Sequence, residues 1–285
     1  MNTPFNFRLT KFPNEAEILR HEVREFLSDA LKDIPKETRA ETWYGADENF
    51  SRKVGKKGWI GLNWPKEYGG AGRSSMERYV ILEEMLTAGA PVGAHWISDR
   101  QSGPLIIRYG SEKHQKELLP GILKGESYFC IGMSEPDSGS DLAALRTKAE
   151  KKGNIYLVNG TKLWTSGAHR CQYMIALFKT SQEEDRHGGF SQFIVDLSLP
   201  GVTIRPIIDL AGRHHFNEVI FEDVEVPEDM LIGTEGNGWN QVTAELALER
   251  SGPERYLSSY ILLQELVNEF SNKNDDEGVI EIGRQ

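Results

Sequence analysis

YFCIGM (128–133) begins a series of short, strand-like runs that decides the fold of this chain. The runs that follow it are NIYLVNG (154–160), KLWTS (162–166), YMIALFKT (173–180), FSQFIVDL (190–197), VTIRPI (202–207) and NEVIFEDVEVP (217–227). Turn residues such as Gly153-Asn154 and Asn159-Gly160 separate them. Because strands at this spacing, without helices between them, oppose a parallel α/β sheet, the pattern predicts one antiparallel β unit over about 127–230.

The chain before this unit has a helical period. After a candidate cap at Pro13 and Asn14, apolar residues recur every three to four positions, at Leu19, Val23, Phe26, Ala30 and Leu31. Two further helices are predicted at about 75–88 and 112–124. The loop WPKEYGGAGRSS (64–75) precedes the first of them, and its proline and glycines are typical of a break between elements.

The helical period returns after Gly233. The apolar positions that a long helix would place near one stripe are Trp239, Val242, Leu246, Tyr256, Tyr260, Leu263 and Leu266. Pro253 is expected to kink or offset this helix. The acidic run NKNDDEG (272–278) is typical of a loop, and a new helix is expected from Val279. Because the sequence stops at Gln285 within that pattern, we expect a chain shortened at this end.

The composition is that of an ordinary globular protein, with 39% hydrophobic and 27% charged residues. The sequence has neither an apolar stretch long enough for a membrane helix nor a secretory signal pattern. Cys130 and Cys171 are far apart and lack metal-ligand spacing, which favours a reducing, cytoplasmic location. A net charge of −10 disfavours nucleic acid as a partner but allows a local site for a phosphorylated cofactor.

Several common site motifs are absent from the sequence or fit it poorly. Neither GxGxxG nor a P-loop occurs, which argues against a Rossmann-type dinucleotide site. The segment WTSGA does not satisfy the GxSxG pattern of serine hydrolases. His214 and His215 are adjacent on an expected strand, where neighbouring side chains face opposite ways, so we predict no metal site.

Four long segments resemble the acyl-CoA dehydrogenase family, in the expected order. They are GWIGLNWPKEYGGAG (58–72), IGMSEPDSGSDLAALRTKA (131–149), NGTKLWTSGAHRCQYMIAL (159–177) and FEDVEVPEDMLIG (221–233). The resemblance implies a mainly α fold with a central antiparallel β domain that is barrel-like. It implies an N-terminal helical domain at 1–126, a middle β domain at 127–232, and an incomplete C-terminal helical bundle at 233–285.

The resemblance also implies FAD as the cofactor and assigns residues to it. Those expected at the flavin are Met133, Ser134, Gly139, Trp164, Thr165 and Ser166, and Ser140 is expected near the thioester. Met133 and Ser134 would meet the ring, and Gly139 would let the chain approach closely. Trp164 to Ser166 would cover one face and donate a hydrogen bond. Without the resemblance, the favoured interpretation of PDSGSD is an ordinary polar turn, and that of Trp164 an ordinary core residue.

The resemblance places the catalytic base at Glu249, within LALER (246–250) on the helix after the β domain. In this respect the sequence resembles the family members that carry the base on this helix, to which isovaleryl-CoA dehydrogenase belongs. Glu245 and Glu254 are alternatives on the same segment, and Glu249 would otherwise be a surface residue paired with a nearby arginine. Arg250 would either contact the CoA part of the substrate or be solvated.

The implied function is FAD-dependent α,β-dehydrogenation of an acyl-CoA to the 2-enoyl-CoA, with electrons passed to an electron-transfer flavoprotein. Such a protein would act in fatty acid and lipid metabolism, including beta-oxidation, as a homo-oligomer (dimer or homotetramer) or as a heteromer with a homologous chain. Two alternatives stay open: a non-catalytic or half-site subunit of a heteromer, and an oxygen-using oxidase or monooxygenase on the same scaffold. The segment AHWISDRQSGPLII (94–107) is expected to border the acyl site, where Trp96 would shape the pocket or pack in the core.

Overall fold

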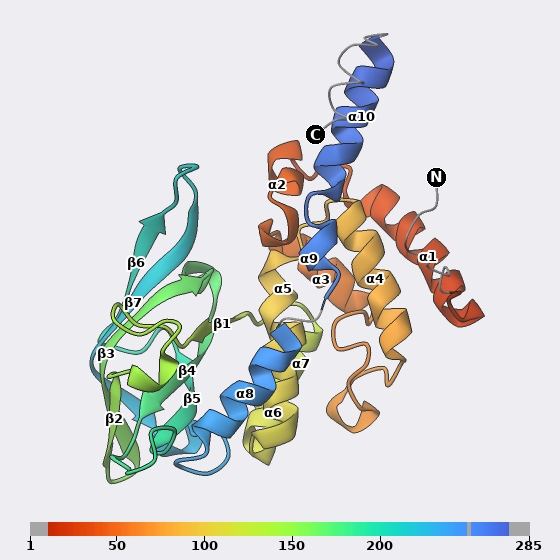
Figure 1. The fold of residues 1–285 in the computed structure, drawn as a ribbon. Coiled ribbons are helices and arrows are strands. Elements are labelled where there is room, and N and C mark those ends of the chain that lie inside the picture. Colours follow the sequence, from red (N-terminus) through yellow and green to blue (C-terminus); the bar gives the residue numbers. More distant parts are fainter. Residues whose placement is uncertain (1–10, 250–251, 274–285) are drawn as a thin grey trace, which may run out of the picture.

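The computed structural model describes residues 11–249 and 252–273. Helices form one body and a curved sheet the other, and α8 runs between them (Figure 1). The helices before the sheet are α1 (Asn14–Ala30), α2 (Lys36–Ala40), α3 (Glu48–Lys56), α4 (Ser75–Thr87), α5 (Gly93–Ile97), α6 (Gly103–Tyr109) and α7 (Glu112–Leu123). Shorter turns are η1 (Thr42–Tyr44), η2 (Lys66–Tyr68) and the π-helical η3 (Ser98–Ser102) between α5 and α6.

The predicted helices of this part are confirmed. Helix α1 follows Pro13, and its buried positions include Leu19 and Val23 of the predicted stripe. Helix α4 begins with a capping box in which the Ser74 hydroxyl accepts from the Glu77 backbone N–H and the Glu77 carboxylate accepts from the Ser74 N–H. These two helices pack against each other and form part of the larger hydrophobic core.

The sheet has the strands β1 (Phe129–Gly132), β2 (Lys148–Lys152), β3 (Ile155–Ser166), β4 (Tyr173–Lys179), β5 (Phe190–Asp196), β6 (Val202–Ile208) and β7 (His214–Pro227). Their order is β1-β4-β2-β3-β7-β6, and β5 also pairs with β4. The predicted antiparallel arrangement needs one correction, because β1 lies parallel to β4 and a single residue pair of β2 and β4 is also parallel. The chain from β1 to β4 passes through the β2–β3 hairpin, so β4 returns in the direction of β1.

The sheet contributes to two cores. One lies within the β unit, where Phe178 meets Phe193 and Phe221. The other belongs to the helices and includes Phe129 of β1 and Ile194 of β5. The helices and one side of the sheet are therefore packed on shared apolar side chains, and the division of the chain at residues 126 and 232 stays a prediction.

After η6 (Glu228–Met230) come α8 (Gly238–Glu249), α9 (Glu254–Leu257) and α10 (Tyr260–Lys273). Helix α9 begins directly after Pro253, so the predicted interruption at this proline is confirmed. The apolar stripe continues only in part, because Val242 of α8 is buried whereas Leu263 and Leu266 of α10 are exposed. Residues 274–278 of the predicted loop and the helix expected from Val279 lie outside the described residues. Within the part of the chain described, every helix is too short or too polar to cross a membrane.

Candidate functional site

A cavity of about 320 Å³ lies where the helices meet the sheet. Its walls come from η1, α5, η3, β1, β3, α8 and α9. The lining residues are Trp43, Tyr44, Trp96, Ile97, Arg100, Gln101, Ile131, Met133, Ser134, Leu163, Trp164, Ser166, Leu246, Glu254 and Arg255. Four of the six residues predicted at the flavin are among them, namely Met133, Ser134, Trp164 and Ser166. A cavity of this size, lined by aromatic and aliphatic side chains together with polar and charged ones, can hold a small molecule.

The loop after β1 is anchored beneath this cavity by a buried ion pair. The Lys162 ammonium, on β3, lies 2.9 Å from the Glu135 carboxylate and donates to the Met133 carbonyl at 3.1 Å. The same carboxylate accepts from the backbone N–H groups of Arg146 and Thr147, at 2.6 and 3.0 Å. The turn PDSGSD is thus fixed at both ends. Sequence reasoning missed this anchor, although a lysine within a strand pattern was its visible signal.

The charges of this pair respond to burial and to each other. Burial lowers the pKa of Lys162 from its ordinary value to about 8, and the Glu135 charge opposes that shift. Burial alone would raise the pKa of Glu135, but the Lys162 charge, the Thr147 hydroxyl and the Arg146 N–H together lower it. Both groups therefore stay charged at neutral pH, and the loop keeps its ionic tie.

Trp164 enters the cavity through an irregularity in β3. The pairing of β3 with β7 shifts register between Lys162 and Thr165, and Trp164 has a φ of 61°. A bulky side chain in this left-handed region is an outlier, and such strain concentrates at functional sites. The indole is 56% exposed and touches Phe216 edge to face, with ring centroids 5.8 Å apart. The bulge therefore presents a large aromatic face where a ligand ring can lie against it.

The other predicted cofactor and thioester residues lie outside the cavity lining. The Thr165 side chain is buried, and its hydroxyl has no hydrogen-bond partner among the described residues. Gly139 and Ser140 are exposed on the anchored loop. A Cβ at Gly139 would meet no atom of the described residues within 4 Å, so none of these neighbours requires glycine there.

The three candidate bases differ in their surroundings. Glu249 ends helix α8, but its side chain and the whole of Arg250 lie outside the described residues. Glu245 is buried away from the cavity, where it accepts from the Gln192 amide at 2.9 Å. Glu254 lines the cavity and forms an ion pair with Arg100 at 2.6 Å.

The helical wall of the cavity is aromatic and was foreseen only in part. Trp96 lines it, as the expected border segment implies, and its ring lies 5.8 Å from that of Trp43. Trp43 in turn stacks on Tyr44, with ring centroids 4.0 Å apart. The sequence did not single out Trp43, Tyr44 or Arg100, because they line the cavity only through long-range packing.

The residues present fit a flavin. A strained, exposed indole supplies a face for a planar ring. Met133, Ser134 and Ser166 add polar and backbone groups at the same opening. By contrast, the described residues contain no cluster of three or more His, Cys, Asp or Glu that could hold a metal ion.

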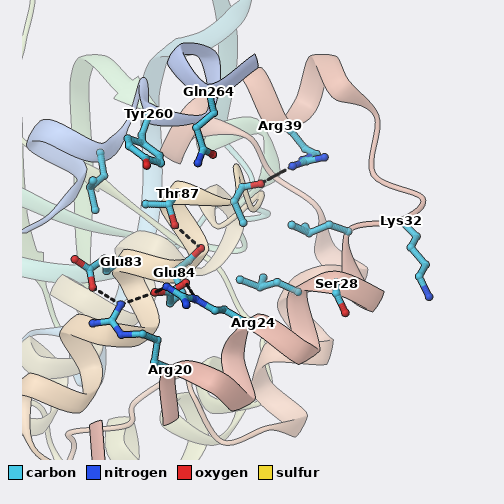
Figure 2. A pocket seen from close by; sticks show the side chains of 14 residues that line it. Arg20, Arg24, Ser28, Lys32, Arg39, Glu83, Glu84, Thr87, Tyr260 and Gln264 are labelled. Carbon is cyan, nitrogen blue, oxygen red and sulfur yellow. Dashed lines mark hydrogen bonds and ion pairs between the residues drawn. The ribbon is translucent and has the colours of Figure 1, made fainter. Parts of the chain in front are cut away.

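Two other hollows differ in character. One of about 400 Å³ shares Tyr44 with the cavity and is lined by Arg170, Arg213, His214 and His215, together with Glu41, Asp209 and Phe216. A wider groove of about 830 Å³ lies on the far helices, where α1, α4, α9 and α10 meet. Figure 2 shows Arg20 directed toward Glu83 and Glu84 across the groove, and the Arg39 guanidinium donates to the Ala88 carbonyl. This pairing leaves the wider groove without the convergent unpaired groups of a reaction site.

Comparisons with known proteins agree with the fold. The family models for the N-terminal and middle domains of acyl-CoA dehydrogenases match residues 13–126 and 130–224. Acyl-CoA dehydrogenase FadE29 of Mycobacterium tuberculosis is 38% identical over 250 residues, which cover 86% of this chain and 64% of FadE29. Isovaleryl-CoA dehydrogenase of Pongo abelii is 30% identical over 87% of this chain and 59% of its own length. The chain thus spans about two thirds or less of these relatives.

Solved structures show the same arrangement. The Tcur3481-Tcur3483 steroid ACAD superposes with a TM-score of 0.83 at 31% identity, over 93% of this chain and 69% of that one. The ChsE4-ChsE5 complex of Mycobacterium tuberculosis superposes with a TM-score of 0.81 at 32% identity, over 95% and 69%. The predicted fold class is therefore confirmed. Two domain models match in order, and a solved structure shares both the fold and 31% sequence identity. The chain therefore belongs to the acyl-CoA dehydrogenase family.

Proposed function

We propose that this chain takes part in the FAD-dependent α,β-dehydrogenation of an acyl-CoA, with electrons passed on to an electron-transfer flavoprotein. One observation carries the proposal: residues of β3 and of the loop after β1 that suit a flavin share one cavity with Leu246 of α8 and Glu254 of α9. FAD, when bound there, would supply the acceptor for the hydride of the β carbon. The sheet side of the cavity would then hold the cofactor, and the helical side the acyl group.

The base for the α proton is assigned to Glu249. Leu246 of α8 lines the cavity. Residue 249 is three positions further along the same helix, and helix positions three apart lie on the same side. An apolar, aromatic surrounding raises the pKa of a carboxylate and makes it a stronger base toward a weakly acidic C–H bond. Glu254 suits this role less well, because its carboxylate is already paired with Arg100.

Phosphate groups of the cofactor or of CoA suit the neighbouring hollow of about 400 Å³. Arg170 and Arg213 are the candidate phosphate partners in this hollow, where Glu41 and Asp209 balance their charge. Burial lowers the pKa of His215 to about 4, and the Arg170 charge adds to that shift. The imidazole is therefore neutral at pH 7, and its buried Nε2 has no hydrogen-bond partner among the described residues.

A spectrum tests the proposal. The purified protein is expected to show a flavin spectrum that bleaches when an acyl-CoA is added without oxygen. Rapid recovery of colour in air would point instead to an oxygen-using enzyme on this scaffold. A colourless protein that takes up no added FAD would contradict a catalytic role for the chain by itself.

A second candidate is a subunit of a heteromeric dehydrogenase, and two observations favour it. The ChsE4-ChsE5 relative is a complex of two different proteins. Helix α10 exposes Leu262, Leu263, Leu266 and Val267, each between 41 and 50% exposed, a row suited to burial by another chain. Co-purification with a homologous chain would support this candidate, and failure to bind flavin even with that partner would indicate a structural role. For both candidates we also propose a cytoplasmic location and a place in beta-oxidation.

A further inference from the structure

The acyl side of the cavity contains a buried ion pair. Arg100 of η3 and Glu254 of α9 lie 2.6 Å apart, from Nη1 to Oε1, and neither residue is more than 5% exposed. Both line the same cavity as Trp164 and Met133. An acyl group placed against the predicted flavin face would therefore have this pair as part of its surroundings.

The surrounding chain is built closely around the pair. The Arg100 guanidinium lies over the Trp96 ring, 4.8 Å from its centroid. A Cβ at Gly252 would collide with the Glu254 carboxylate and come within 2.7 Å of Arg100 Nη2, so a larger residue there would displace the two paired side chains. Arg100 itself lies in a π-helical segment, a distortion often found at functional sites.

Stability alone does not account for such a pair. Removing two charges from water costs several kcal/mol each, and an apolar pair of similar volume is often equally stable or more so. An enzyme acting on plain alkyl chains would gain from an apolar wall here. A charged pair that faces the ligand cavity is instead what recognition of a polar group requires.

Resting on the proposed function, we propose that Arg100 and Glu254 recognise a hydroxyl group on the acyl part of the substrate. Arginine only donates hydrogen bonds and carboxylate only accepts them, whereas a hydroxyl does both. The Glu254 Oε2 atom is buried against Gly252 and has no hydrogen-bond partner among the described residues, so it can accept from a hydroxyl once the carboxylate turns toward the cavity. The aromatic neighbours Trp43, Tyr44 and Trp96 suit a ring that carries this hydroxyl.

This recognition disfavours the unsubstituted acyl group. A hydrocarbon at the same place would leave the Glu254 oxygen unsatisfied and would remove the remaining solvation of the pair. A ketone would accept from Arg100 but would offer no donor to Glu254. The expected order of affinity is therefore hydroxyl first, ketone second and hydrocarbon last.

The test compares three kinds of acyl-CoA whose acyl group carries a cyclohexyl ring. The first has an unsubstituted ring and the second has a ketone on the ring. The third is a set of esters with one hydroxyl each, placed at a different ring position in each ester. Binding to the flavin-loaded protein, with any co-purifying partner chain, is measured by calorimetry on the 2-enoyl thioesters, so that affinity is read without turnover. The best hydroxylated ester is expected to bind roughly 10- to 100-fold more tightly than the unsubstituted one. The double variant Arg100→Met with Glu254→Leu should bring this ratio close to one.

Matched controls separate recognition from stability. Arg20→Met removes an ion-paired arginine between α1 and α4, outside the cavity, and should leave the ratio unchanged. Arg100→Lys should keep part of the preference because it keeps the charge without the planar donor set. Equal binding of all esters by the natural protein, or an unchanged ratio in the double variant, overturns the inference and leaves the proposed function intact. Failure to bind any ester, despite bound flavin, overturns both.

Discussion

Lys162 lies beneath the candidate flavin site with its ammonium 2.9 Å from the Glu135 carboxylate. The Lys162 side chain is fully buried and that of Glu135 nearly so. Because Lys162 also donates to the Met133 carbonyl, one side chain joins strand β3 to the loop predicted to hold the cofactor. The position of that loop thus depends on a charge located on a different strand.

Replacing Lys162 by methionine is expected to cost about 3–5 kcal/mol of unfolding free energy, because Glu135 would remain buried without its counter-charge. The loop would lose its tie to β3, so flavin should also bind more weakly. Urea unfolding and FAD titration measure the two effects.

Two further variants serve as controls for Lys162→Met. Adding Glu135→Gln should recover part of the lost stability, since it removes the unpaired buried charge and the amide oxygen still accepts from one of the two backbone N–H groups, those of Arg146 and Thr147. Lys151→Met removes an exposed lysine paired with Glu228 and should change little. Equal losses for Lys162→Met and Lys151→Met would contradict a special role for the buried pair.

Trp164→Asn is expected to separate stability from cofactor binding. Asparagine tolerates the left-handed φ of 61°, which relieves roughly 1–2 kcal/mol of backbone strain. The edge-to-face contact with Phe216, a kind worth about 0.5–1.5 kcal/mol, is lost in exchange. We therefore expect an unfolding free energy within about 1 kcal/mol of the natural value, while FAD affinity falls clearly. Unchanged FAD affinity would show that the indole does not contact the cofactor.

His95 should make the fold sensitive to mild acid. Burial lowers its pKa to about 4, an effect that the Asp99 charge opposes, and its Nδ1 lies 2.8 Å from the Ser51 hydroxyl. Between pH 6.5 and 4 the unfolded chain binds a proton that the folded protein does not, so stability falls as pH falls through this window. At pH 5 the loss from this group is about 2 kcal/mol relative to pH 7.

The comparison variant for this effect is His95→Gln, which keeps a polar side chain beside Ser51. Urea unfolding of both proteins at pH 7 and pH 5 isolates the histidine, because all other titrating groups are shared. The variant should lose less stability than the natural protein on going to pH 5. An equal loss in both would show that folding does not lower the pKa of His95.

Local patterns predicted much of this fold because their causes are local. The apolar spacing of Leu19 and Val23 specifies which face of α1 is buried, and the proline at 253 interrupts the helix in any context. The parallel pairing of β1 with β4 was not predictable in this way. It depends on which strands become neighbours after the whole β unit folds.

The candidate site was predictable to a similar extent. Met133, Ser134, Trp164 and Ser166 carry the family resemblance and lie together in the structure. The pairs Lys162–Glu135 and Arg100–Glu254 join residues 27 and 154 positions apart, and no short motif encodes such contacts. Their roles in placing the loop and lining the cavity follow from packing alone.

Glu249→Gln tests the assignment of the base. Loss of general-base catalysis is expected to slow flavin reduction by an acyl-CoA about 10²- to 10⁴-fold, while FAD and the enoyl product still bind. Stopped-flow absorbance without oxygen measures the rate. Glu245→Gln is the matched control, because Glu245 lies one helical turn earlier but is held by Gln192 away from the cavity. That control should lose stability and keep its rate of flavin reduction. If Glu254→Gln stops reduction and Glu249→Gln does not, the base is Glu254 and the Arg100 pair belongs to proton transfer.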